Sequence, residues 1–134
     1  MIPMLLAAML AAPAPADTVV GTWRTETKHG VVQIERCGAS LCGRLMSSDG
    51  LRANPGLTDS KNKDEKLRRR PLKGVLMLSG FKWDDGAWTG GQVYNPDDGR
   101  TYSGKITVID ADHLKLRGCV FVPLCKTQTW TRVH

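Results

Sequence analysis

The sequence predicts an all-β domain in which about eight antiparallel strands form an up-and-down barrel. From residue 17 onwards, apolar and polar residues alternate in short runs, which is the pattern of strands with one buried face. Turn residues at hairpin spacing separate nearly all of these runs, and strong helix candidates are absent. Closure into a barrel removes exposed strand edges, which favours it over the alternative, a two-sheet sandwich.

The expected strands follow one another in short steps. In the first hairpin, Val32 and Ile34 share one face and Gln33 and Glu35 the other, before a turn at 37–40. Further turns are expected at 83–86, 95–99 and 110–112, and Pro123 breaks the chain before the last strand. The expected strands are 19–25, 30–37, 41–46, 74–82, 87–94, 100–109, 113–122 and 124–133.

Residues 1–16 form an apolar segment without charged side chains that ends in Ala14-Pro15-Ala16. This ending is typical of a secretory signal peptide, so we expect cleavage after Ala16 and one mature domain at 17–134. The run is too short and too interrupted by proline for a permanent transmembrane helix, which needs about 20 residues. The alternative is a disordered tail. The sequence thus predicts a periplasmic protein, which we expect to be monomeric.

Four cysteines behind a signal peptide indicate disulfide bonds. We expect Cys37–Cys42 and Cys119–Cys125, because each pair brackets a predicted hairpin turn and facing hairpin residues lie within disulfide reach. Long-range pairing of the two clusters is one alternative. A four-cysteine zinc site is the other, although its ligand spacing and an oxidising compartment both disfavour it.

One long polar connection, residues 47–73, interrupts the strands. Asn54-Pro55-Gly56 is a turn signal, and residues 64–70 suit one or two helical turns that Pro71 would end. Residues 61–73 contain seven Lys or Arg and two acidic residues, so they hold +5 of the net charge of +6. Connections of this length are usually lids, binding loops or disordered segments.

Gly21-Thr22-Trp23 lies in the first expected strand, and Arg132 stands in the last. This combination resembles the calycins, the lipocalin-like barrels, whose first strand carries Gly-x-Trp and whose last strand carries an arginine packed across that Trp. The resemblance implies a lipocalin-like barrel that Trp23 and Arg132 close.

A second resemblance covers about the whole of 17–134. The segments GTWRT, VVQIERCGASLCGRL, YNPDDGRTYSGK, LKLRGCV and TQTWTRV, with Asp59, Asn62 and LRRRPLKG at 67–74, resemble the bacterial exported family called domain of unknown function 2147. Its loop commonly reads Asp-x-x-Asn-Pro-Asp…Leu-Arg-x-Arg-Pro-Leu, and here Lys63 replaces the Pro, which implies a looser turn. The family implies a small periplasmic β-domain with no established activity.

Two groups of residues are candidates for ligand binding. Cations of the loop suit phosphate, carboxylate or acidic polymers, and the alternative is a solvated loop. Aromatic residues beside the central turns would line a pocket if they face inward, and the alternative is core packing. The candidates are Lys66, Arg68, Arg69, Trp88, Tyr94 and Tyr102.

Asp59, Asn62 and Arg70 are interpreted as a structural anchor of the loop. Asp and Asn hydrogen-bond the backbone in turns, and Arg70 can pair with Asp59. The alternative is a polar clamp at the mouth of the barrel.

We expect no enzyme activity, no cofactor and no metal. His29, His113 and His134 stand far from one another and from any Cys, no Gly-x-Ser-x-Gly elbow is present, and the turn at 95–99 lacks calcium-loop spacing. Nucleic acid is a poor partner for an exported protein whose basic loop lacks interleaved aromatics. The sequence therefore predicts binding of a small apolar or amphipathic ligand. The alternative is an interaction protein whose loop at 61–73 binds acidic envelope components or a protein partner.

Overall fold

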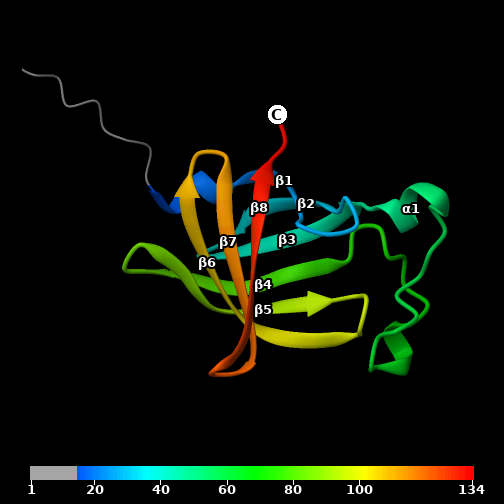
Figure 1. Cartoon of the computed structure of the whole chain (residues 1–134). Coiled ribbons are helices and arrows are strands. Elements are labelled where there is room, and N and C mark those ends of the chain that lie inside the picture. The colour runs from blue at the N-terminus through cyan, green and yellow to red at the C-terminus, as the bar shows by residue number, and fades with distance from the viewer. Residues whose placement is uncertain (1–14) are drawn as a thin grey trace, which may run out of the picture.

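The computed structural model describes residues 15–134, which form a closed antiparallel barrel of eight strands (Figure 1). Each strand pairs with the next along the chain, and β1 also pairs with β8, where Trp23 lies opposite Arg132. The strands are β1 (Gly21–Arg24), β2 (Val31–Cys37), β3 (Ser40–Ser47), β4 (Leu76–Asp84), β5 (Ala87–Asn95), β6 (Arg100–Asp110), β7 (His113–Phe121) and β8 (Leu124–Arg132). The predicted fold class is confirmed, and closure of the sheet excludes the sandwich.

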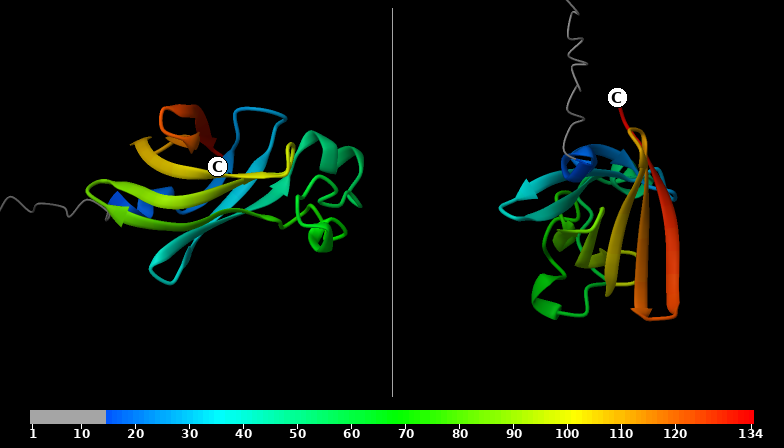
Figure 2. Two further views of the ribbon diagram at one scale, coloured as in Figure 1. Left: turned by 90° about the horizontal axis from the view of Figure 1, so that it is seen from below. Right: turned by 90° about the vertical axis from the view of Figure 1, so that its left-hand side faces the viewer.

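Short helical elements lie at two opposite ends of the barrel (Figure 2). The 3-10 helix η1 (Pro15–Val19) lies at one end, and helix α1 (Asp49–Ala53) and the 3-10 helix η2 (Glu65–Leu67) lie at the other. The barrel connections alternate between these ends. The long connection between β3 and β4 lies at the second end and carries both α1 and η2.

The sequence pattern missed α1, and of the one or two helical turns expected at 64–70 a single 3-10 turn forms. The Ser48 hydroxyl starts α1 by accepting the backbone N–H of Leu51 at 3.2 Å, and Leu51 packs into the core. Helical structure in this range is limited to η2, because the chain that follows η2 pairs with the segment that precedes it. A bridge joins Thr58 to Pro71 beside this point.

The end that carries η1 is sealed by packed side chains. Val19, Trp23 and Trp88 are fully buried. The Trp23 indole donates to the Val19 carbonyl at 2.8 Å, and the Trp88 indole donates to the Ala16 carbonyl at 3.0 Å. Tryptophans of the barrel therefore hold η1 across its end through the η1 backbone.

Arg132 ties the last strand to the first. Its guanidinium lies 4.4 Å from the centroid of the Trp23 ring. A Cβ at Gly21 would lie 2.5 Å from Arg132 Nη1, and Gly21 has a φ of +141°, so both space and backbone favour glycine there. The guanidinium also donates to three backbone carbonyls, those of Thr18, Val20 and Ala111.

Phe81 fills the interior of the sealed half. Its ring lies over Gly91 and Gly104 of the two following strands, where an added Cβ would come within 2.3 Å and 2.8 Å of the ring. Ile34, Ile106 and Leu114 are also fully buried in this core. This half of the barrel is therefore solid.

The two disulfides join Cys37 to Cys42 and Cys119 to Cys125, which is the predicted pairing. The first brackets the β2–β3 turn and the second links β7 to β8. Within the part of the chain that the structure describes, no helix has the length and hydropathy of a membrane span. The predicted signal peptide lies largely at 1–14, outside the described residues, and its last two residues begin η1.

Candidate functional site

The half of the barrel opposite η1 encloses a cavity of about 550 Å³, which we call the calyx. It opens between the β1–β2 loop, α1 and the β5–β6 turn. Leu57 and Leu72 of the long connection add apolar surface. The strands supply an apolar wall formed by Leu45, Met77, Val93, Leu116 and Trp130.

Glycine contributes to the open space of the calyx, whereas large buried side chains fill the sealed half. Gly118 borders the calyx, and an added Cβ there would meet only Tyr102 Cβ, at 3.7 Å, which is ordinary contact. Gly104, its cross-strand partner on β6, is covered by the Phe81 ring instead. The inward face of the sheet thus changes from packed to open between β6 and β7.

Polar groups lie at the mouth of the calyx. Lys28 Nζ lies 3.1 Å from Asp97 Oδ1, so an ion pair joins the β1–β2 loop to the β5–β6 turn. The Tyr102 hydroxyl donates to Asp98, and this hydrogen bond raises the pKa of Tyr102 above its ordinary value. Deeper in the calyx, the Trp130 indole donates to Gln128 Oε1 at 3.1 Å. The site thus combines an apolar wall with a few polar groups.

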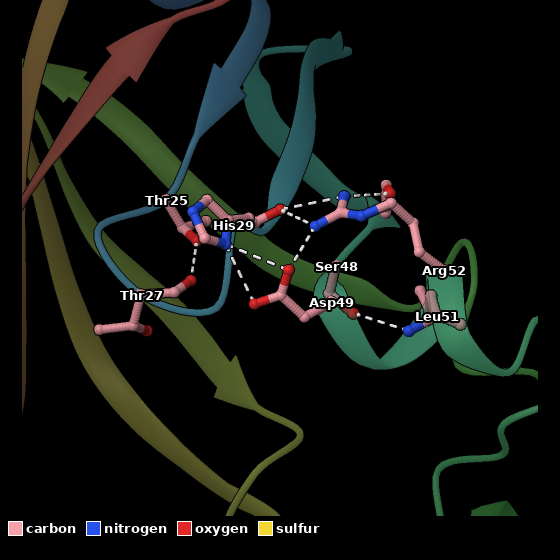
Figure 3. A network of polar contacts seen from close by, with 8 residues as sticks. Thr25, Thr27, His29, Ser48, Asp49, Leu51 and Arg52 are labelled. Carbon is pink, nitrogen blue, oxygen red and sulfur yellow. Dashed lines mark hydrogen bonds and ion pairs between the residues drawn. The ribbon is translucent and has the colours of Figure 1, made fainter.

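The β1–β2 loop is held at the mouth by a polar network with α1 (Figure 3). His29 Nδ1 lies 3.0 Å from Asp49 Oδ2, and Arg52 Nη2 lies 2.7 Å from Asp49 Oδ1. The hydrogen bond with His29, followed by that with Arg52, lowers the pKa of the Asp49 carboxyl. The Asp49 backbone N–H also donates to the Lys28 carbonyl at 2.9 Å. The network therefore positions Lys28 beside Asp97.

A buried carboxylate anchors the long connection. Asp59 is 1% exposed, and its Oδ2 accepts hydrogen bonds from Asn62 Nδ2 at 2.8 Å and from Arg70 Nε at 2.9 Å. Its Oδ1 accepts the Tyr94 hydroxyl at 2.6 Å, which joins the connection to β5. Burial, followed by this hydrogen bond, raises the pKa of Tyr94 to about 12. Asp59, Asn62 and Arg70 thus form one cluster with Tyr94.

A second hollow of about 570 Å³ lies between the long connection and β4, β5 and β6. Arg70 and Tyr94 border it, so the Asp59 cluster forms part of its wall. Charged side chains of Lys63, Asp64 and Arg100 also border it. It lacks the continuous apolar wall of the calyx, which is therefore the better candidate for an apolar ligand.

Two of the six predicted ligand residues, Tyr94 and Tyr102, border both cavities. Trp88 borders neither, because it is fully buried in the sealed half and its indole bonds to η1. The three predicted loop cations, Lys66, Arg68 and Arg69, also border neither of these cavities.

Of the three predicted loop cations, all of which are exposed, one donates a hydrogen bond to the loop backbone. Arg68 Nε donates to the Asn62 carbonyl at 2.8 Å, so Arg68 belongs with the anchored part of the loop. Lys66 and Arg69 are exposed.

Sequence reasoning missed most of the calyx wall. Alternation places Leu114 and Leu116 on one face of their strand, and Gln128 and Trp130 are similarly two residues apart. That signal identifies an inward face, but it does not distinguish the solid half from the hollow half.

Comparisons with known proteins agree with the barrel. A family model described as "Uncharacterized protein conserved in bacteria (DUF2147)" matches residues 21–132. Among solved structures, the chain is similar to protein HP1028 from the human pathogen Helicobacter pylori, which is described as belonging to the lipocalin family. That match has a TM-score of 0.76 and 24% identity and covers 86% of this chain and 82% of that one, so it supports the fold alone. No curated protein matches the chain.

Proposed function

Because this chain belongs to the DUF2147 family of bacterial proteins and folds as a lipocalin-like barrel, we propose that it binds a small apolar or amphipathic molecule without catalysing a reaction. The observation that carries the proposal is the hollow, apolar half of an otherwise packed barrel. Its volume of about 550 Å³ falls within the range of small-molecule sites, which runs from about 300 to 1,000 Å³.

The wall and the mouth of the calyx suit different parts of such a ligand. Removing apolar surface from water contributes about 25 cal/mol per Å², and Met77, Leu116 and Trp130 offer an apolar surface for that burial. A polar end of the ligand would lie at the mouth, beside Lys28 and Lys126. This division favours an amphipathic molecule that enters with its apolar end first.

We also propose that the protein is exported to the periplasm after cleavage behind Ala16. Two disulfides suit an oxidising compartment. A chain that begins at Asp17 keeps the Asp17–Arg36 ion pair at 2.8 Å and the buried Val19, and it loses the Ala16 carbonyl that Trp88 contacts. An intact mass of protein from its own host that corresponds to 17–134 supports the cleavage site, and a mass that includes residues 1–16 refutes it.

The ligand proposal can be tested by filling the calyx from a glycine that has space around it. Gly118→Leu places a side chain in the calyx, where a Cβ meets no close atom. Thr127→Leu is the matched control, because Thr127 is exposed on β8 between two calyx residues and borders no described cavity. Both variants are titrated with the neutral fluorescent probe N-phenyl-1-naphthylamine.

We expect Gly118→Leu to weaken probe binding by about tenfold or more, since ~1.4 kcal/mol of steric conflict has that effect. The Thr127→Leu control should bind as wild type does. Equal binding by all three proteins would place the probe outside the calyx and refute the proposed site.

A further inference from the structure

The tip of the β7–β8 hairpin carries a continuous exposed apolar patch. Val120, Phe121, Val122 and Leu124 are 62%, 61%, 73% and 57% exposed. Other exposed apolar side chains, such as Ile109 on β6, are separated from this patch in the sequence. Single exposed apolar residues are normal, but contiguous patches mark interaction sites. We name residues 120–124 the apolar tip.

The apolar tip is held in a defined shape. The Cys119–Cys125 disulfide links the strands directly behind it, and Phe121 pairs with Leu124 across the hairpin. These links restrict the conformations of the tip before it binds. Binding to a partner would therefore cost little additional conformational entropy.

The charged residues of the hairpin that carries the tip are all Lys or Arg. Between residues 113 and 132 it contains Lys115, Arg117, Lys126 and Arg132, and it contains no Asp or Glu. Lys126 pairs with Gly118 immediately behind the disulfide. Arg117 and Lys126 therefore place positive charge beside the apolar tip, whereas Arg132 is held at the other end of the hairpin by Trp23.

The basic loop lies on the same side of the molecule as the apolar tip. In Figure 1 and in the right-hand view of Figure 2, both the β7–β8 turn and η2 reach the lowest part of the molecule. Exposed cations surround η2, namely Lys61, Lys63, Lys66 and Arg69. One side of the protein thus presents an apolar projection together with a basic loop.

We propose that this side docks on the surface of a lipid bilayer that contains anionic lipid. Apolar side chains that enter the acyl boundary and cations that contact lipid phosphates are the two components of interfacial membrane binding. This assignment gives a partner to Lys61, Lys66 and Arg69, which border neither cavity. Gly118 and Lys126 border the calyx directly behind the tip, so docking would hold the calyx near the bilayer.

The test is flotation of the purified full-length mature protein with lipid vesicles. Vesicles of phosphatidylethanolamine and phosphatidylglycerol are compared with vesicles of phosphatidylcholine alone. The tip variant is Phe121→Ser with Val122→Ser, and the loop variant is Lys66→Ser with Arg69→Ser. The matched control, Ile109→Ser with Lys82→Ser, removes one exposed apolar residue and one exposed cation from other strands.

We expect wild type to bind the anionic vesicles and to bind phosphatidylcholine at least about tenfold more weakly. The tip variant should lose about tenfold or more of its affinity for anionic vesicles, and the loop variant about tenfold, while the control matches wild type. Circular dichroism of each variant verifies folding, and release of wild type by high salt tests the electrostatic part without any substitution.

Three outcomes would overturn the proposal. The first is that wild type does not bind anionic vesicles. The second is that the tip variant binds them as wild type does. The third is that the tip substitutions abolish self-association in solution and leave vesicle binding intact, which would make the tip a protein interface. None of these results depends on occupancy of the calyx, so this proposal and the proposed ligand site stand or fall separately.

Discussion

Replacing Asp59 with alanine is expected to detach the long connection from the barrel while leaving the barrel folded. The substitution removes the acceptor of hydrogen bonds from Asn62, Arg70 and Tyr94. Hydrogen bonds that involve a charged group contribute about 1.5–3 kcal/mol each. The Arg70 side chain is 34% exposed and regains water when freed, so its contribution is reduced. We therefore expect a loss of about 3–4 kcal/mol from the free energy that holds the connection closed.

Limited trypsin digestion measures this change, because the connection contains several Lys and Arg cleavage sites. When opening and closing are fast, the cleavage rate follows the population of the open form. A loss of about 3–4 kcal/mol then predicts cleavage at least about 100-fold faster for Asp59→Ala, since each 1.4 kcal/mol is tenfold. Asp84→Ala is the control, because Asp84 is an exposed carboxylate on β4 with no described ion pair.

Two results would refute this reasoning. Cleavage of Asp59→Ala within about twofold of the wild-type rate would show that the carboxylate does not hold the connection. A fall in the thermal midpoint of the whole barrel that accounts for the faster cleavage would show that the connection does not open as a separate unit.

Three further predictions concern the stability of the barrel, measured by urea unfolding. The pKa of Tyr94 is raised to about 12 in the folded protein, whereas it is about 10 in the unfolded chain. The neutral form of Tyr94 therefore stabilises the fold below about pH 10, and this stability is lost as the pH rises towards 12. Tyr94→Phe should remove that part of the pH dependence. Gly104→Ala should cost about 1–3 kcal/mol through conflict with Val93 and Phe81, whereas Gly118→Ala should change stability by less than about 0.5 kcal/mol. Arg132→Ala should cost about 2–4 kcal/mol, and Arg132→Lys should recover less than half of it, because lysine lacks the planar fork. An unchanged pH dependence in Tyr94→Phe, or an unchanged free energy of unfolding in Gly104→Ala or Arg132→Ala, would show that the contact concerned does not stabilise the barrel.

The fold was predictable because its signals are local. Val32 and Ile34 alternate with polar neighbours, and short turns follow each run, so strand faces and hairpins can be read from adjacent residues. Helix α1 was missed because its five residues include Gly50 and it depends on the Ser48 cap and on burial of Leu51. Burial of that kind is a tertiary contact, and a short window of sequence does not contain it.

The site was less predictable because it depends on contacts between strands. Alternation places Gly118 on the face of Leu114 and Leu116, but only the assembled barrel shows that the Phe81 ring covers Gly104 and that an added Cβ at Gly118 meets only Tyr102 Cβ, at 3.7 Å. The loop cations present the same difficulty. Arg68 and Arg69 are both arginines of the same run, yet Arg68 Nε donates a hydrogen bond to the Asn62 carbonyl.

The most direct test of the calyx as a ligand site is native mass spectrometry of protein purified from its own bacterium. We predict that wild type carries a non-covalently bound small molecule, that Thr127→Leu retains it, and that Gly118→Leu loses it because a side chain occupies the calyx. A wild-type protein with no bound molecule, or a molecule retained equally by Gly118→Leu, would contradict a ligand site inside the barrel.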